Sequence, residues 1–291
     1  MPAGGKPTVR SRRLGAALKR LRLASQLDQD RAADAVDCSV AKISRIESGQ
    51  VSARVGDVRV LLDLYGVQDG AERGRLEKLA RDSNKRGWWL DYRTPTLTQL
   101  GDFIALEADA TYIRSWQPVF IPGVLQTPAY TRALIAANPA VITAEAADEI
   151  VKVRQQRREA IQETGARFAA VIWEPALTAP MPSSEAHSAQ LAHIAEISRQ
   201  QNVTIQVLPL DEWAAARVAT PFVTFAFGPE PAPEAVAFDS LSNTVILEDS
   251  DELVNYAHAF DTLRSAALTP DKSRAFIEKT IKSIPREGRN P

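Results

Sequence analysis

The stretch "SVAKISRIESGQ" (Ser39–Gln50) decides how the first part of this chain folds. Ser39 is a favourable helix N-cap and Gly49 a favourable helix end, so the stretch predicts a short helix between them. Ile43 and Ile46 share one side of that helix. The opposite side carries small, polar and cationic residues: Ala41, Ser44, Arg45 and Ser48. A helix that only faces solvent more often carries Glu and Lys, whereas slim residues with a few donors suit the DNA major groove.

The flanking sequence predicts a purely helical domain around this stretch. Asp28, Ser52 and Asp69 are candidate N-caps of further helices, and leucines at helical spacing precede them. No strand pattern interrupts the series. Residues 10–84 are therefore predicted to form an all-α domain of five short helices, preceded by a disordered tail over 1–9.

Charge separates this segment from the rest of the chain. Residues 1–87 contain 18 Lys and Arg against 11 Asp and Glu, whereas the remaining residues contain 17 against 25. A basic segment on an acidic body indicates a polyanionic partner for the first part only. Surface charge that is unevenly spread for no functional reason is the alternative.

The composition also indicates where the protein works. The 291 residues are 45% hydrophobic and 24% charged, as in an ordinary globular protein. No apolar run approaches the roughly 20 residues of a membrane span, and the first residues lack the apolar stretch of a signal peptide. The single cysteine, Cys38, excludes an intramolecular disulfide and fits a reducing compartment. We therefore expect a cytoplasmic protein without a membrane partner.

The composition changes at "NKRGWWLDYRTPT" (84–96), which we interpret as a domain joint held by Trp88, Trp89 and Tyr92. Beyond it, helical patterns alternate with β-branched and aromatic runs bounded by Pro, Asn, Gly or Asp. Helices are predicted at about 99–115, 124–137, 143–163, 185–200, 250–267 and 270–283, and strands at 166–173, 202–210, 222–227, 234–240 and 243–249. Residues 85–284 are thus predicted to form a mixed α/β domain with a partly antiparallel sheet, followed by a polar tail over 285–291. The expected fold class of the whole chain is α+β.

The segment "LKRLRLASQLDQDRAADAVDCSVAKISRIESGQ" (18–50) resembles the helix-turn-helix of phage-repressor-like (XRE-type) bacterial regulators. The matching positions are Leu27, Gln29, Ala33, Ser39, Ile43, Ser44, Ile46, Glu47 and Gly49. The resemblance implies that the DNA-facing residues are Gln29, Ser39, Val40, Ala41, Lys42, Ser44 and Arg45. It also implies a partly buried ion pair between Arg22 and Glu47. Asp37 stands where the family's turn usually has Gly, and Asp tolerates the left-handed conformation better than most residues.

The segment "GWWLDYRTPTLTQLGDFIALEADATYIRSWQPVFIPGVLQTPAYTRALI" (87–135) resembles a C-terminal domain of poorly defined function in antitoxin-like regulators. Such regulators are often encoded beside a very short protein, which implies a possible small protein partner. Trp116, Gln126 and Tyr130 are candidates for an effector pocket, since pockets often lie at motif-rich loops. In the alternative interpretation, "PGVLQT" (122–127) is a tight turn whose Gln126 or Thr127 bonds the backbone near a helix start.

Chemistry beyond binding has little support in the sequence. His187 and His193 are six residues apart and do not share a helix face, so no zinc site is predicted. There is no Gly-x-Ser-x-Gly elbow and no Gly-rich phosphate loop. We therefore expect no catalytic residue, no metal and no cofactor.

Together these patterns predict a sequence-specific regulator that binds double-stranded DNA as a homodimer, because one short reading helix contacts few base pairs. The domain over 85–284 is expected to dimerise and to sense a ligand or small partner protein. Two alternatives remain open. One is an enzyme domain targeted by a DNA-binding head. The other is an antitoxin-like scaffold that holds a partner and regulates its own synthesis.

Overall fold

A computed structural model describes residues 8–83, 100–137, 144–179, 181, 183–239, 244–248 and 250–284. The chain divides into two compact units, Met1–Leu90 and Asp91–Pro291. The predicted joint with Trp88, Trp89 and Tyr92 lies outside the described residues, as do residues 1–7 and the tail over 285–291. Hereafter the first unit is called the head and the second the body.

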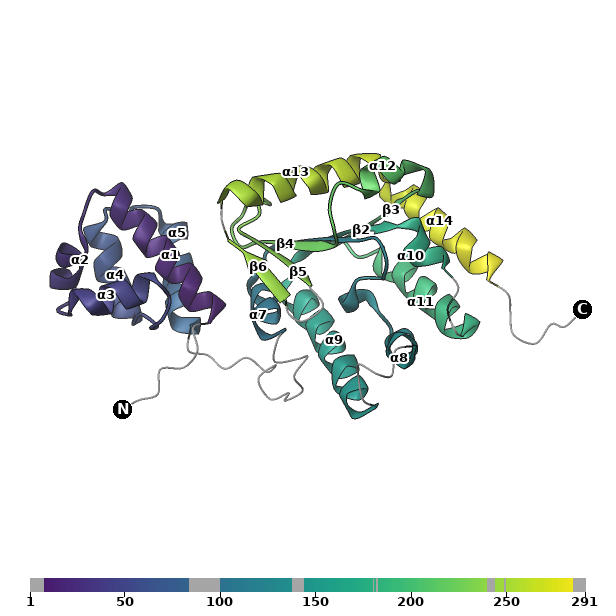
Figure 1. Cartoon of the computed structure of the whole chain (residues 1–291), viewed down its shortest axis with the longest axis horizontal. Helices are drawn as coiled ribbons and strands as arrows, with labels where there is room; N and C mark the ends of the chain where they lie inside the picture. The colour runs from purple at the N-terminus through teal and green to yellow at the C-terminus, as the bar shows by residue number, and fades with distance from the viewer. Residues whose placement is uncertain are drawn as a thin grey trace, which may run out of the picture. The chain divides into compact units, whose positions relative to one another are not determined.

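The described part of the head contains five helices and no strand (Figure 1). They are α1 (Val9–Ala24), α2 (Gln29–Ala35), α3 (Val40–Glu47), α4 (Val55–Leu64) and α5 (Gly70–Asp82). The predicted caps Asp28, Ser39 and Asp69 are confirmed, because each side chain accepts a hydrogen bond from a backbone N–H in the first turn that follows. The predicted cap Ser52 is wrong, since α4 begins after Arg54 without a side-chain cap.

The start of α1 also differs from the prediction of a disordered tail over 1–9. Thr8 caps the helix: its hydroxyl accepts a hydrogen bond from the Ser11 N–H, and its own backbone N–H donates to the Ser11 hydroxyl. Val9 is buried, with 1% of its surface exposed. Residue 8 therefore acts as the helix cap and residue 9 begins the helix, because Val9 adds apolar surface to the core that a purely polar tail would not.

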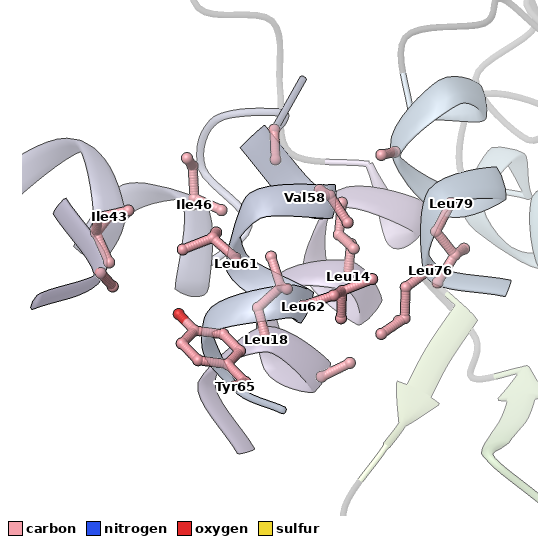
Figure 2. Close-up of a cluster of buried hydrophobic side chains, with 14 of the residues drawn as sticks. Leu14, Leu18, Ile43, Ile46, Val58, Leu61, Leu62, Tyr65, Leu76 and Leu79 are labelled. Atoms are coloured by element: carbon pink, nitrogen blue, oxygen red, sulfur yellow. The ribbon is translucent and has the colours of Figure 1, made fainter. Parts of the chain in front are cut away.

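One apolar core holds the head together. Figure 2 shows side chains from α1, α3, α4 and α5 converging on a common centre. The buried members that it labels are Leu14, Leu18, Ile43, Ile46, Val58, Leu61, Leu62, Tyr65, Leu76 and Leu79. Ala32 and Ala33 of α2 belong to the same core, so all five helices contribute to it, and the orientation of α3 is determined by tertiary packing.

The body combines a sheet with helices, so the α+β class is confirmed. Its described strands are β1 (Tyr112–Gln117), β2 (Arg167–Trp173), β3 (Val203–Leu208), β4 (Phe222–Ala226), β5 (Ala235–Asp239) and β6 (Thr244–Leu247). Its described helices are α7 (Gly101–Asp109), α8 (Pro128–Ala136), α9 (Ala144–Thr164), α10 (Glu174–Thr178), α11 (Ser184–Ile197), α12 (Trp213–Ala216), α13 (Ser250–Ala266) and α14 (Pro270–Ser283). Two short 3-10 turns are η2 (Gly123–Leu125) and η3 (Leu210–Glu212).

These strands form one mixed sheet in the order β3-β2-β1-β4-β5-β6. β1, β2 and β3 pair in parallel, whereas β1, β4, β5 and β6 pair antiparallel. The parallel half needs crossovers, which α9 and α11 supply along the chain. The prediction of a partly antiparallel sheet is therefore confirmed.

Helices cover both faces of the sheet (Figure 1). On one face, Phe260 and Leu263 of α13 pack with Trp116 of β1. On the other, Phe103 of α7 meets Phe225 of β4 edge to face, with ring centroids 5.3 Å apart. Figure 1 shows α9 on this second side of the sheet. Strand β1 lies between β2 and β4 and is covered on both sides.

Strand β1 corrects the predicted helix over 99–115. The helix α7 ends at Asp109, Ala110 is already extended, and Tyr112–Gln117 forms β1 at the centre of the sheet. No Gly or Pro marks this break, and the sequence "ALEADA" before it is strongly helical. The remaining predicted strands and long helices agree with the structure to within a few residues, except that α8 begins at Pro128.

Candidate DNA-binding surface

The turn between α2 and α3 has the geometry that the sequence predicted. Asp37 has a φ of 49°, the left-handed conformation that Asp tolerates. Ser39 then accepts a hydrogen bond from the Lys42 N–H at 3.2 Å and starts α3. Gly49 ends the region with a φ of 72°, which favours glycine. The turn at Asp37 and the Ser39 cap thus fix where α3 begins, and Gly49 fixes where the region ends.

Helix α3 has one buried side and one exposed side. Ile43 and Ile46 are 1% and 2% exposed and lie in the core of the head. The exposed residues at its start and along its outer side are Ser39, Val40, Ala41, Ser44 and Arg45. This surface has no acidic side chain, and its small residues would allow a nucleic acid to approach the helix closely.

Two cations on α3 are held differently. Lys42 is half-buried, and its ammonium lies 3.2 Å from a carboxylate oxygen of Asp57 at the start of α4. Arg45 is exposed, and its Nε donates to the Ala41 carbonyl one turn earlier at 3.2 Å. An exposed guanidinium with further donors can reach an outside acceptor at small cost, whereas Lys42 would first give up its carboxylate.

Gln29 belongs to a buried network. Its amide nitrogen donates to Glu47 at 2.8 Å, so this end of Gln29 points into the head. Glu47 also accepts two hydrogen bonds from Arg22, at 2.6 and 3.0 Å, and Arg22 donates to the Leu27 carbonyl at 2.7 Å. The implied ion pair between Arg22 and Glu47 is therefore present, and Gln29 donates a further hydrogen bond to its carboxylate.

The network shifts the protonation of its members. Burial raises the pKa of Glu47, but hydrogen bonds from Arg22 and Gln29 and the charge of Arg22 lower it more, so the pKa lies below its ordinary value. The hydrogen bond to Glu47 raises the pKa of Arg22. Both groups are thus charged at neutral pH, and the pair clamps the end of α3 to α1.

Sequence reasoning missed the residue that lets α1 and α3 approach. A Cβ on Gly15 of α1 would lie 2.2 Å from the Ile46 carbonyl oxygen of α3. No side chain fits in that space, so only glycine permits this backbone contact. The signal was a glycine inside a predicted helix, which is unfavourable without a packing reason. Arg31 in the first turn of α2 and Arg54 just before α4 are further exposed cations of the head that the sequence did not single out as candidates for DNA contact.

The structure does not bring the three pocket candidates of the body together. Trp116 is fully buried on the face of the sheet that α13 covers, and its indole N–H donates to the Ala219 carbonyl at 3.0 Å. Gln126 lines a cavity that also includes Ile113 and Ser115, which point to the opposite face of β1. Tyr130 is buried but does not line this cavity. Trp116 therefore belongs to the core of the other face.

The alternative interpretation of "PGVLQT" is confirmed in its geometry. The Gln126 amide donates to the Ile121 carbonyl at 2.7 Å, and Thr127 caps α8. The Gln126 carbonyl oxygen accepts from the Thr131 hydroxyl at 3.1 Å and from Arg154. The loop is hence structural, and it also forms part of the cavity wall.

Among the residues that the structure describes, no three His, Cys, Asp or Glu side chains gather where they could hold a metal ion. Likewise, none of their helices combines the length and apolar composition needed to cross a bilayer.

Comparison with known proteins agrees with this division. Residues 13–76 match the family described as "Helix-turn-helix domain", and residues 100–279 match the one described as "Domain of unknown function (DUF5753)". No curated protein and no solved structure matches the chain. The head is thus a helix-turn-helix domain, as DNA-binding regulators carry. Because the second match covers more than half of the chain, this protein belongs to the DUF5753 family.

Proposed function

We propose that this protein is a sequence-specific transcription regulator of the XRE type that acts on double-stranded DNA in the cytoplasm. Helix α3 supplies the reading surface, and the body dimerises and senses a ligand. The observation that carries the proposal is the two-sided α3, with Ile43 and Ile46 buried and Ser44 and Arg45 exposed on a slim surface without acids. No catalytic step is assigned to the chain.

The proposed contacts divide into two groups. Val40, Ala41, Ser44 and Arg45 face base edges, because the first residues of a recognition helix reach deepest into the groove. Arg31 and Arg54 face phosphates, together with Ser39 at the helix start. Gln29 and Lys42 act at most indirectly, since Glu47 and Asp57 hold them.

The length of α3 supports a dimer. Eight helical residues span about 12 Å, and base pairs follow one another at 3.4 Å along the helix axis, so α3 covers roughly four base pairs. Four base pairs recur too often for useful specificity. Two copies on a two-fold operator would double the contacts, and half-sites about one helical turn apart are expected.

The proposal is tested by selecting bound sequences from a random DNA pool with the full chain. We expect an enriched motif with two-fold symmetry, and binding that weakens steeply with salt because phosphate contacts release counterions. Light scattering of the free protein should give the mass of two chains. No enrichment and no salt dependence would contradict DNA reading, whereas a monomer on an enriched single half-site would contradict only the dimer.

A further inference from the structure

A cavity of about 590 Å³ lies in the body between the sheet and the helices of one face. Small-molecule sites usually measure roughly 300–1,000 Å³. Alternate residues of β1 form the floor of this cavity, and residues of α9 that share one helix face form a wall: Ile150, Val153 and Arg157. Phe120, in the loop after β1, is 52% exposed and so lies where the cavity meets solvent. The cavity thus has the size of a ligand site and a side from which a ligand can enter.

The cavity lies beside the strand at which the sheet changes its pairing. β1 pairs in parallel with β2 and antiparallel with β4. The loop that leaves the carboxyl end of β1 supplies five consecutive lining residues, 120–124. In open α/β sheets, ligands bind outside the carboxyl ends of strands, at a point where the topology of the sheet switches. The position of the cavity in the fold therefore agrees with a ligand site, independently of its size.

The lining of the cavity is mainly apolar. Of its 24 residues, 18 are hydrophobic residues, proline or glycine. Phe168 of β2 pairs with Ile113 of β1, so both side chains face the cavity, and Phe103 of α7 joins them. Walls of this kind take up the apolar body of a ligand, because the surfaces of both leave water.

Two of the three charged side chains in the lining form a buried ion pair. Arg157 donates two hydrogen bonds to Glu107, at 2.6 and 2.9 Å. The Arg157 guanidinium also lies over the Phe103 ring, 4.9 Å from its centroid. Both charged residues are buried, with 9% and 4% of their surfaces exposed. These two charges therefore balance each other within the wall.

The third charged side chain, Arg154, is held by the loop after β1 and by α8. Its guanidinium donates to the Gln126 carbonyl oxygen and to the Thr131 hydroxyl. The side chain also lies close to Gly123, where a Cβ would be 3.3 Å from the Arg154 Nε. A charged ligand would lose its hydration on entry and would have to break contacts of this kind to gain a partner, whereas a neutral apolar ligand gives up little hydration.

We propose that this cavity binds a small, neutral and mainly apolar molecule in preference to a charged one. The apolar body of the molecule lies against the phenylalanine and aliphatic walls, and the Arg157–Glu107 pair stays intact. The inference deepens the ligand sensing in the proposed function and rests on it for its regulatory meaning. Binding itself requires no DNA, so it is measured on the free protein.

Two dyes with nearly the same aromatic body test the preference for a neutral ligand. One is N-phenyl-1-naphthylamine, which is neutral, and the other is 8-anilinonaphthalene-1-sulfonate, which carries a sulfonate. Each dye is titrated into the full-length protein and followed by fluorescence. We expect the neutral dye to saturate one site per chain and to bind about tenfold more tightly, or better, than the anionic dye. No saturable binding of the neutral dye, or equal or tighter binding of the anionic one, would overturn the proposal.

Variants that fill the cavity from two different walls locate the site. Leu134 of α8 and Gln117 of β1 line the cavity and are only half-buried, so a larger side chain at either position has room without displacing the core. Leu134→Trp and Gln117→Trp should each weaken the neutral dye by about tenfold or more. Ala136→Trp is the matched control, because Ala136 is exposed at the end of α8 and does not line the cavity. It should leave the affinity unchanged.

The outcomes distinguish this inference from the proposed function. Binding of the neutral dye that survives in a folded Leu134→Trp or Gln117→Trp protein, or that Ala136→Trp weakens as much, contradicts the cavity site even if DNA binding is normal. Conversely, an Arg45→Ala protein that no longer binds DNA should bind the neutral dye as before. Cooperative thermal unfolding of each variant establishes that a loss of binding is not a loss of fold.

Discussion

Gly15 of α1 and Ile46 of α3 meet so closely that a Cβ on Gly15 would lie 2.2 Å from the Ile46 carbonyl oxygen. The obstacle is backbone, which cannot turn aside as a flexible side chain can. Ile46 itself is buried in the core, and Glu47 beside it is clamped by Arg22. The orientation of α3 in the head therefore depends on a position that carries no side chain at all.

Replacing Gly15 by Ala should destabilise the head by at least about 1–3 kcal/mol, the usual cost of overpacking. Hydrogen exchange of peptides from α1 and α3 measures this, with peptides from α9 as an internal reference for the body. Gly74→Ala is the control, because Gly74 lies on an exposed part of α5 and its new Cβ would meet nothing within 4 Å. That variant should gain about 0.5–1 kcal/mol. Equal effects at the two positions would contradict the close approach.

The Arg22–Glu47 pair predicts a dependence of the head's stability on pH. Burial raises the pKa of Glu47, but the hydrogen bonds and charge of its partners lower it more, so the pKa in the folded head lies below its ordinary value. The folded head therefore binds fewer protons than the unfolded chain near this pKa. The stabilising effect of the ionised Glu47 is complete above the pKa that this carboxyl has in the unfolded chain. It is lost as the pH falls through the lower pKa that the carboxyl has in the folded head.

Glu47→Gln should remove this part of the pH dependence. The opening free energy of α3, from hydrogen exchange, should fall less steeply from about pH 5 to pH 3 in the variant. Glu77→Gln provides a contrast, since Glu77 pairs with Arg59 on the surface and salt screens such pairs. If added salt suppresses the pH dependence that comes from Glu47 as fully as the one that comes from Glu77, the Arg22–Glu47 pair is not buried in solution.

Ser115→Ala tests whether the cavity hydroxyl is structural. Because this buried hydroxyl has no partner among the described residues, its removal should leave the melting temperature of the body unchanged or slightly raised. Ser273→Ala is the comparison: the Ser273 hydroxyl accepts from the Val207 N–H at 2.9 Å and donates to the Leu268 carbonyl. Its removal should cost about 1–3 kcal/mol. A comparable loss at Ser115 would show that its hydroxyl has a structural partner.

Local signals in the sequence predicted much of the head. The caps Asp28, Ser39 and Asp69 and the turn residue Asp37 act within a few residues of themselves, so their roles follow from residue type and spacing. Gly15 could not be assigned in this way, because its role depends on the backbone of α3, more than 30 residues away.

The body shows the same limit. Strand β1 is covered on both faces, so it lacks the alternation of polar and apolar residues that marks a half-exposed strand. Its polar members Ser115 and Gln117 face the cavity instead of solvent. Likewise, Trp116 and Gln126 are ten residues apart in sequence but lie on opposite sides of the sheet. Only the paired strands reveal which side chains share a face.

The central claim is that α3 reads DNA, and Arg45 tests it most directly. Arg45→Ala and the parent protein are compared in binding selections and titrations with the enriched sequence and with random DNA. The variant should lose about 1–3 kcal/mol on the enriched sequence and relax the preference at one position. Arg59→Ala removes another exposed arginine of the head, on α4, and should leave the preference intact. Unchanged affinity and unchanged preference in Arg45→Ala, or the same loss in Arg59→Ala, would contradict α3 as the reading helix.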